Sequence, residues 1–506
     1  MAIVPLLGLW CASLFPQQPC TAEPVNITGQ RPIVYAHLMH CFILGTMEKA
    51  FVNQKPMDNP DQWPEIEAGL HQIWANDVFS LKSAGAEGIK KDFAMAEAAG
   101  LDAFSLLINE KHLQPTNQFA PTIRLVAQVA STQKVKIFPD LWSTTLTAAE
   151  WEAYGKLIKE LMDTYPDAFL RYHGRYLINL GNPINYGIGK GGYNEWTAMK
   201  AFFTPWGGPE KFYTILNCTW RAEDMVGYGE NVDAFSMWVA NQGWGDRQVQ
   251  ALLDFAKTYK KPLCWPVAVS YWGNRPLAQC RVAETLGVSH FSDLWRQAIA
   301  LKTPFVKIES WNDFGEDHCI TDTNYRGTTI MELNRYFSDW YHSGKQPAVA
   351  TEKVYVFHHR QLVNATRTEA TVHAHNDKWH MTPTTDYVNV VTILKKAADV
   401  QVEIAGKTWK TTVPAGYHEW LVYTPSARTE PGPEKVAFNH GADSYPSTSA
   451  TRTVTIADAI PGGLPVVSIA RDGKTSVVLQ SRMALAATGR FDDLCLVGTG
   501  TTITAK

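Results

Sequence analysis

Two acids in one short segment are the residues best placed to do chemistry. Asp313 and Glu316 lie three residues apart, directly after an apolar run, Phe305–Ser310, that predicts a β-strand. Alternation along a strand would place Glu309, Trp311 and Asp313 on one face. Cleavage of a glycosidic bond requires one carboxylic acid and one carboxylate, and this pair could supply both. The alternative is a pair of capping or salt-bridging acids on a structural rim.

The elements that must position these acids alternate between two kinds of segment. Apolar residues at helical steps, such as Ile89, Phe93 and Ala96, are followed by a C-cap candidate, Gly100. A capping box begins another helix at Thr147. Between such stretches we expect eight strands: Ile33–Ala36, Leu101–Ile108, Val135–Phe138, Arg175–Leu180, Phe212–Leu216, Val232–Trp238, Pro262–Val269 and Phe305–Ser310.

Eight strands alternating with helices predict an α/β fold, a (β/α)8 TIM-like barrel. A doubly wound open sheet would give a similar count, but the glycine-rich phosphate loop of its nucleotide-binding version is missing from the sequence. The helical period ends near Ser343–Pro347, and short β-rich runs follow, which predicts a C-terminal all-β sandwich. We therefore expect a catalytic barrel over residues 23–347 and a β-sandwich domain over residues 348–506.

Composition narrows the class of protein. The 506 residues are 45% hydrophobic and 19% charged, with a formal net charge of −3, so a large core is expected and nucleic-acid binding is not. The apolar run Ile3–Phe15 is too short to span a membrane. Residues 1–22 are interpreted as a signal peptide, or alternatively as a buried N-terminal segment. We expect a secreted or periplasmic protein without a membrane span, in which most of the six cysteines after residue 22 are buried free thiols.

In a barrel the active site lies at the carboxyl ends of the strands. The residues there are rich in tryptophan, asparagine, aspartate and histidine and poor in lysine and arginine, a composition that favours a neutral oligosaccharide over a phosphorylated ligand. Any single tryptophan in this set is more often a core residue than a sugar platform. The expected substrate-binding residues are His37, Asn109, Asp140, Asn179, Trp220, Trp238, Tyr271, Trp272, Trp311, Asn312 and His318.

Several of these segments resemble motifs of glycoside hydrolase family 71, the endo-α-1,3-glucanases or mutanases. Residues 308–318 resemble its W-N-D-Y-G-E-S-H motif, residues 35–39 its first-strand F-A-H-x-M, and residues 91–108 its D-I-x-x-A-K-A-A-G-I-D-A-F-A-L-N-I. Asp140 falls where the family has an aspartate after strand three, and residues 233–238 are similar to D-G-x-F-S-W. Departures from the motifs are Phe314 for tyrosine, Asp317 for serine, Cys319 for tyrosine, Leu107 for asparagine and Val239 for an acid.

The resemblance implies a hydrolase of α-1,3-glucan in which Asp313 and Glu316 are the catalytic acids. It also implies an inverting reaction, with Glu316 as general acid and Asp313 as general base. Two carboxylates need neither a metal nor another cofactor, so none is expected. Two other readings stay open: an endo-α-mannosidase-like enzyme, whose families carry W-N-E-W-x-E, and a non-catalytic barrel that only binds glycan.

Overall fold

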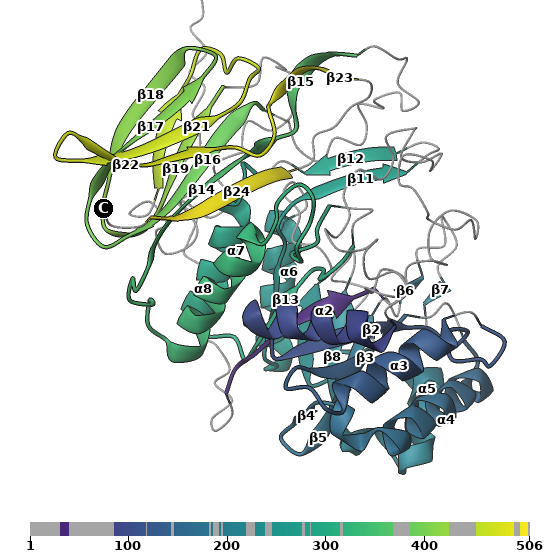
Figure 1. The fold of residues 1–506 in the computed structure, drawn as a ribbon. Coiled ribbons are helices and arrows are strands. Elements are labelled where there is room, and N and C mark those ends of the chain that lie inside the picture. The colour runs from purple at the N-terminus through teal and green to yellow at the C-terminus, as the bar shows by residue number, and fades with distance from the viewer. Residues whose placement is uncertain are drawn as a thin grey trace, which may run out of the picture.

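Figure 1 shows the computed structural model of the chain. Most of the barrel and of the C-terminal sheets is described, but residues 1–30, which include the expected signal peptide, are not. The structure describes residues 31–39, 85–117, 119–142, 146–181, 184–185, 192–193, 196–218, 228–237, 245–275, 279–283, 285–313, 317–367, 385–424, 452–489 and 496–503.

The eight expected barrel strands are confirmed. All of them pair in parallel, in the order β10-β13-β1-β2-β3-β5-β8-β9, and the short strand β4 (Arg171–Tyr172) pairs antiparallel with β5. The parallel strands are β1 (Ile33–Leu38), β2 (Ala103–Ile108), β3 (Lys136–Leu141), β5 (Arg175–Gly181), β8 (Phe212–Cys218), β9 (Ala234–Met237), β10 (Cys264–Val267) and β13 (Phe305–Ile308).

The two end strands of this order nearly close the sheet into a barrel. A single parallel bridge joins Phe235 of β9 to Leu263, just before β10. The Phe235 N–H donates to the carbonyl of Pro262 at 3.1 Å. The result is an eight-stranded, nearly closed parallel barrel, which excludes the open doubly wound sheet.

Helices cover the outside of this barrel in Figure 1. Among the described residues, none of the helices combines the length and the apolar character needed to cross a membrane. The helices are α2 (Ala86–Ala98), α3 (Ala120–Ala130), α4 (Ala148–Thr164), α5 (Trp196–Met199), α6 (Gly245–Tyr259), α7 (Ser289–Leu301) and α8 (Thr329–Ser343). Short 3-10 helices span Pro166–Ala168, Lys200–Trp206 and Pro209–Lys211, and two small hairpins pair β6 (Ile184–Asn185) with β7 (Gly192–Tyr193) and β11 (Tyr271–Arg275) with β12 (Gln279–Ala283).

Local signals in the sequence set two of these helix ends. Thr147 and Glu150 form the predicted reciprocal capping box at the start of α4, where the Thr147 side chain accepts the Glu150 N–H and the Glu150 carboxylate accepts the Thr147 N–H. After α2, Gly100 adopts a φ of +82°, a conformation that costs other residues energy. A Cβ at Gly100 would also lie 2.8 Å from Ser338 Cβ of α8, so this close helix approach requires glycine.

Side chains that point into the barrel form two layers. The lower layer is apolar or weakly polar and takes at least one residue from every strand: Ile33, Tyr35, Ala103, Phe138, Leu177, Tyr213, Ile215, Ala234, Cys264 and Phe305. Because side chains on one face of a strand recur every second residue, the next inward position lies two residues further toward the carboxyl end. That position is polar and buried on seven of the eight strands: His37, Ser105, Asp140, Asn179, Asn217, Ser236 and Lys307, with Pro266 on the eighth.

The C-terminal part consists of two main sheets that share one hydrophobic core. These two sheets and their shared core support the expected sandwich in part. One sheet has the order β20 (Arg452–Ile456), β19 (Gly416–Tyr423), β16 (Tyr387–Leu394), β14 (Glu352–His359) and β24 (Leu496–Ile503). The other has the order β18 (Lys407–Val413), β17 (Ala398–Ile404), β21 (Val466–Arg471) and β22 (Lys474–Gln480), and a separate ladder pairs β15 (Gln361–Arg367) with β23 (Ala486–Gly489).

A buried charge network joins these sheets to the barrel helix α7. The Arg452 guanidinium on β20 lies 3.1 Å from an Asp293 oxygen on α7 and 3.0 Å from an oxygen of Glu419 on β19. Arg296 of α7 bridges the same two acids at 3.2 and 3.4 Å. Burial pushes the pKa of Glu419 upward, but the two guanidinium groups outweigh it and hold that pKa below its ordinary value. The network therefore depends on all four charges being present together.

We predict that Arg452→Met lowers the free energy of unfolding by about 3–5 kcal/mol, because it leaves two carboxylates buried with one cation fewer. Chemical denaturation monitored by circular dichroism measures the change. Lys159→Met is the matched control, since Lys159 pairs with Asp163 on the exposed surface of α4, and its cost should stay below about 1 kcal/mol. Equal effects of the two substitutions would show that the buried network does not hold the two parts together.

Two adjacent histidines at the end of β14 should make the C-terminal sheets sensitive to acid. Burial lowers the pKa of His358 to about 4 and that of His359 to about 3. Both stay neutral when folded, whereas the unfolded chain takes up protons below a pH of about 6.5, so stability is lost as the pH falls from there toward 3.

We predict that His359→Phe, which cannot be protonated and keeps a ring beside Tyr387, shifts acid unfolding to lower pH. The recovered stability should reach roughly 4 kcal/mol at the acid end of this range. Tryptophan fluorescence across a pH series measures the midpoint, and an unchanged midpoint would contradict the prediction.

Candidate active site

The upper inward layer brings three of the predicted substrate-binding residues to one end of the barrel. His37 lies on β1, Asp140 on β3 and Asn179 on β5, each in the second half of its strand. Asp140 pairs directly with Asn179 in the β3–β5 ladder. Because parallel strands place their carboxyl ends at one rim, these side chains lie together at the mouth of the barrel. Barrel enzymes bind their substrates at this end.

His37 and Asp140 form a buried pair at this mouth. The Nδ1 of His37 donates to Oδ2 of Asp140 at 2.9 Å, and both side chains are at most 1% exposed. The Trp142 ring lies 5.9 Å from the His37 ring, which encloses the pair from the end of β3. The histidine is therefore held in one orientation by a carboxylate, the arrangement that fixes the tautomer of a reactive imidazole.

Three polar atoms of this group have no hydrogen-bond partner among the described residues. They are Oδ1 of Asp140 and both amide atoms of Asn179, and the two residues are fully buried. Buried polar groups are normally satisfied, because an unpaired one costs about 1–3 kcal/mol. Hydroxyl groups of a sugar would offer both donors and acceptors to these atoms.

Gly181, the last residue of β5, provides the space in which the Asp140 carboxylate and the Trp142 indole meet. A Cβ at this position would lie 2.2 Å from Oδ1 of Asp140 and 2.3 Å from Nε1 of Trp142. No side chain fits without displacing one of them. The sequence pattern did not single out this glycine, because a glycine after a predicted strand usually marks only a turn.

Asp313 lies on the segment that follows β13 and is 7% exposed. Its backbone N–H, and that of Asn312, both donate to the Ser310 hydroxyl, which forms a tight turn before the acid. The Asn312 amide group accepts from the Met39 N–H at 2.9 Å and donates to the Met39 carbonyl at 3.0 Å. Asn312 belongs to the segment that carries Asp313, which we call the acid segment. Both amide atoms of Asn312 therefore hold this segment at the end of β1.

The structure places Trp311 in the core instead of at the mouth. Its indole N–H donates to Asp92 of α2 at 2.9 Å, and its ring packs on Phe104 at 5.4 Å. The side chain has no exposed surface. The expected shared face of Glu309, Trp311 and Asp313 fails because β13 ends at Ile308, after which the two-residue alternation no longer applies.

Three other predicted residues take different positions. Tyr271 and His318 are both buried, with ring centres 5.1 Å apart, beside the acid segment. The Asn109 side-chain oxygen accepts the N–H groups of Lys111 and His112, so it stabilises a local turn. Glu316, Trp220, Trp238 and the side chain of Trp272 lie outside the described residues.

A buried lysine in the upper layer was not predicted from the sequence. The Lys307 ammonium on β13 donates to Oδ1 of Asn217 at 2.9 Å and to the Met237 carbonyl at 2.7 Å. It lies 3.4 Å from a Glu309 oxygen, and neither of these two charged side chains is exposed. The signal was present, since Lys307 is two residues after the inward-facing Phe305, and a charge at such a position is expected to find partners.

Burial also changes the pKa of two thiol groups in the barrel. It raises the pKa of Cys264 to about 11 and that of Cys319 to about 12, so both stay protonated. Both are free and buried, as expected for most of the cysteines. In the part of the chain that the structure describes, no three histidine, cysteine, aspartate or glutamate side chains are grouped closely enough to hold a metal ion.

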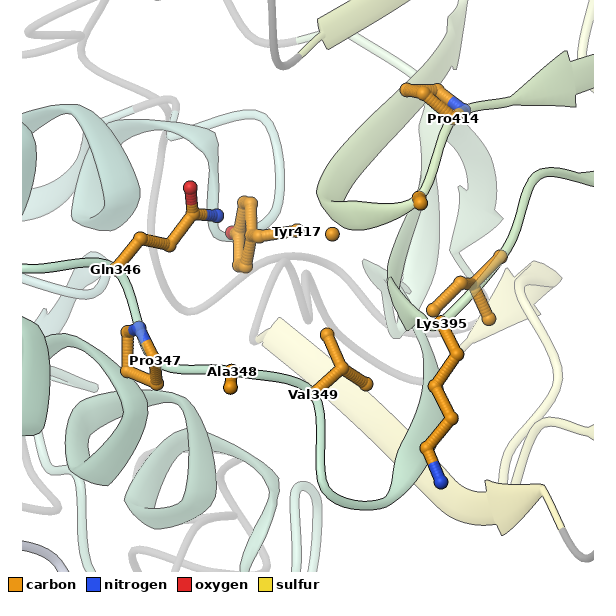
Figure 2. A pocket seen from close by; sticks show the side chains of 10 residues that line it. Gln346, Pro347, Ala348, Val349, Lys395, Pro414 and Tyr417 are labelled. Carbon is orange, nitrogen blue, oxygen red and sulfur yellow. The ribbon is translucent and has the colours of Figure 1, made fainter.

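One cavity of about 530 Å³ lies away from the mouth, between the segment that links barrel and sheets and two turns of the C-terminal sheets (Figure 2). Its polar side chains are those of Gln346, Lys395 and Tyr417, and the rest of its lining is mainly apolar. It contains none of the predicted site residues. The cavity is therefore separate from the predicted site residues.

The structure is a nearly closed (β/α)8 barrel with buried carboxylates and amides at the carboxyl ends of its strands. Barrel enzymes have their active sites at this end. Comparison with known families then gives the assignment. The chain belongs to glycosyl hydrolase family 71, whose model matches residues 78–461.

A mutanase from Penicillium rubens is 25% identical to this chain over 257 residues, which cover 46% of the chain and 49% of the mutanase. The chain thus spans about half the length of this curated relative. Among solved structures, the GH99 endo-alpha-mannosidase from Bacteroides thetaiotaomicron is 13% identical, with 62% of this chain and 98% of that chain covered and a TM-score of 0.46. A GH5_18 enzyme variant from Bifidobacterium longum is also 13% identical, with 52% and 75% covered and a TM-score of 0.37.

We predict that Gly181→Ala lowers glycosidase turnover by about 100-fold, because the added methyl group displaces the Asp140 carboxylate and a shift of about 1 Å is enough for such a loss. Steady-state kinetics with thermal unfolding of the same sample measures it. Gly406→Ala is the control, since a Cβ at Gly406 would meet no atom within 4 Å, and this glycine adopts a positive φ in the C-terminal sheets. That variant should lose stability and keep its turnover, and full activity of Gly181→Ala would contradict the placement of Asp140 at the site.

Proposed function

We propose that this chain is a glycoside hydrolase that cleaves an α-glucan, at α-1,3-glucosidic bonds. The observation that carries the proposal is the family membership over residues 78–461, together with the aspartate of the family-like acid segment, Asp313, on the segment that follows β13. The relative from Penicillium rubens, a mutanase by name, supports the choice of substrate. The unpartnered oxygen of Asp140 and the amide of Asn179 suit a ligand that carries neutral hydroxyl groups.

The proposed reaction is an inverting hydrolysis. Glu316 protonates the glycosidic oxygen as the bond to the anomeric carbon breaks, and Asp313 takes a proton from the water that attacks the opposite face. One molecule of water is consumed, and the new hydroxyl group has the opposite anomeric configuration. The two carboxyl groups must then be roughly 6.5–9.5 Å apart so that the water fits between substrate and base.

Two further parts of the proposal concern the surroundings of the reaction. The His37–Asp140 pair binds a substrate hydroxyl group or the attacking water through the free carboxylate oxygen of Asp140. We also propose that the enzyme is secreted, since an insoluble polysaccharide would be met outside the cell and the apolar N-terminal run suits a signal peptide.

Product analysis tests the substrate. Purified protein is incubated with insoluble α-1,3-glucan, with α-1,4- and α-1,6-glucans, with β-1,3-glucan and with α-mannan, and the released reducing ends and products are measured. Release from α-1,3-glucan alone is the expected result. Activity confined to mannan would contradict the proposed substrate. Binding to glucan without any turnover would contradict the proposed enzyme and indicate a glycan-binding barrel.

We predict that Asp313→Asn and Glu316→Gln each lower kcat by several orders of magnitude with little change in stability, because the shape is kept and the proton chemistry is removed. Turnover on α-1,3-glucan oligosaccharides and a thermal unfolding curve measure both effects. Asp339→Asn is the control, since Asp339 forms an exposed pair with Arg335 on α8 and should leave kcat unchanged.

Proton NMR of the first-formed product completes this test. The β-anomer is expected from an α-linked substrate when the configuration is inverted. A product of retained configuration would rule out the inverting mechanism. Near-normal turnover of both acid variants would rule out the two-carboxylate mechanism.

A further inference from the structure

Asp317, which directly follows Glu316, has a strained backbone. It is 1% exposed and has a φ of +56°, in the left-handed region that residues other than glycine seldom occupy. Such a conformation costs about 1–3 kcal/mol and persists only where the surroundings hold it. The contacts of this residue therefore need an explanation.

The Asp317 side chain is held from two separate parts of the chain. One carboxylate oxygen lies 2.9 Å from the Arg326 guanidinium, which is fully buried. The other oxygen accepts the Leu496 backbone N–H at 3.2 Å, and Leu496 begins β24 of the C-terminal sheet. Burial raises the pKa of Asp317, and Arg326 and the Leu496 N–H oppose this rise.

The backbone of the same residue is also fixed. Its carbonyl accepts from the Arg326 guanidinium at 3.3 Å and from the Ser270 hydroxyl. The same arginine donates to the Cys319 sulfur at 2.9 Å. Asp317 and Cys319 are two of the positions at which this chain departs from the family-like motif, and in the folded chain one arginine contacts both.

The C-terminal sheets contact this segment at a second place. The Gly498 N–H of β24 donates to the Tyr325 carbonyl at 3.1 Å, and the Arg482 guanidinium donates to the Asn324 carbonyl at 3.3 Å. Residues 317–325 are thus held at both ends by the C-terminal part of the molecule. Figure 1 shows β24 running along the side of its sheet that faces the barrel.

The acid segment is fixed on its other side as well, where Ser310 binds the Asp313 N–H. Only three residues separate Asp313 from Asp317, and the second of the two anchors is the buried ion pair. We propose that Asp317 is a positioning residue, through which Arg326 and strand β24 hold the catalytic acid segment in register with the barrel mouth. This inference rests on the proposed function of Asp313 and Glu316.

A positioning role differs from a purely structural one in which step of the reaction it affects. If Asp317 holds the general acid in place, its loss should impair protonation of the leaving group more than substrate binding. An α-glycosyl fluoride needs little help from an acid, because fluoride leaves without first being protonated. A glucose-linked leaving group gains about 10²–10⁴-fold from the acid.

The test compares Asp317→Asn with the wild-type full chain on two probes, an α-1,3-linked glucose oligosaccharide and the α-fluoride of the same oligosaccharide. On the oligosaccharide, kcat should fall by about 10- to 100-fold while KM stays within about threefold. On the fluoride, kcat should stay within about threefold of the wild-type value. Asp317→Ser, which restores the motif residue, is measured in the same way in case the asparagine variant does not fold.

Asp293→Asn is the matched control, because Asp293 is also a buried carboxylate paired with an arginine between barrel and C-terminal sheets, but on α7. It should lower the unfolding temperature and leave kcat unchanged on both probes. Equal losses on the two probes, or full turnover of a folded Asp317 variant on the oligosaccharide, would overturn the proposal.

Glu316→Gln is run alongside to separate the two ideas. It should lose activity on the oligosaccharide and keep it on the fluoride. If Glu316→Gln is fully active on both probes, the assignment of the acid is wrong. If it behaves as expected while the Asp317 variants resemble the wild type, the positioning role alone is wrong.

Discussion

Side-chain alternation along the barrel strands is the constraint on which the rest of the structure depends. Each strand directs every second residue into the barrel. The side chains of one inward layer therefore lie two residues before those of the next layer on the same strand. In this chain the first level is closed by aromatic and aliphatic groups, and the next is polar on seven strands. The change from apolar to polar marks the carboxyl end of the strands, the end at which barrel enzymes bind their ligands.

Placing so many polar groups inside a barrel is costly, and the chain offsets that cost by pairing most of them with one another. Lys307 contacts Asn217 and Glu309, and His37 contacts Asp140. A buried charge without such partners would destabilise the fold by several kcal/mol. Within this layer, Oδ1 of Asp140, both amide atoms of Asn179, the Ser105 hydroxyl and the Asn217 amide nitrogen have no hydrogen-bond partner among the described residues. In our proposal a sugar supplies the missing hydrogen bonds at Asp140 and Asn179.

The C-terminal sheets contribute to this architecture at two levels. Through Arg452 and Glu419 they form a buried charge network with α7, which joins the two parts into one structure. Through the Leu496 backbone N–H they contact the acid segment itself. In our proposal the second contact makes a β-domain remote in sequence part of the catalytic machinery, since one of the partners that hold the strained backbone of Asp317 lies outside the barrel.

Much of the fold could be predicted because its signals are local. Apolar periodicity placed all eight strands within a few residues, and the capping box at Thr147 and the glycine at position 100 marked helix ends correctly. Strand ends were less accurate, because a strand stops where its hydrogen-bonding neighbour stops, which is a tertiary property. The end of β13 at Ile308 decided that Trp311 packs against α2 in the core.

The sequence by itself determined the alternation of elements, the family-like acid segment and the polar residues at the strand ends, since each depends on residue types at short spacing. Only the tertiary structure decided which of these residues meet. His37 and Asp140 are 103 residues apart in sequence, and Asp317 and Leu496 are 179 apart. No local pattern encodes such pairs, because they arise from closure of the barrel and from packing of the C-terminal sheets on it.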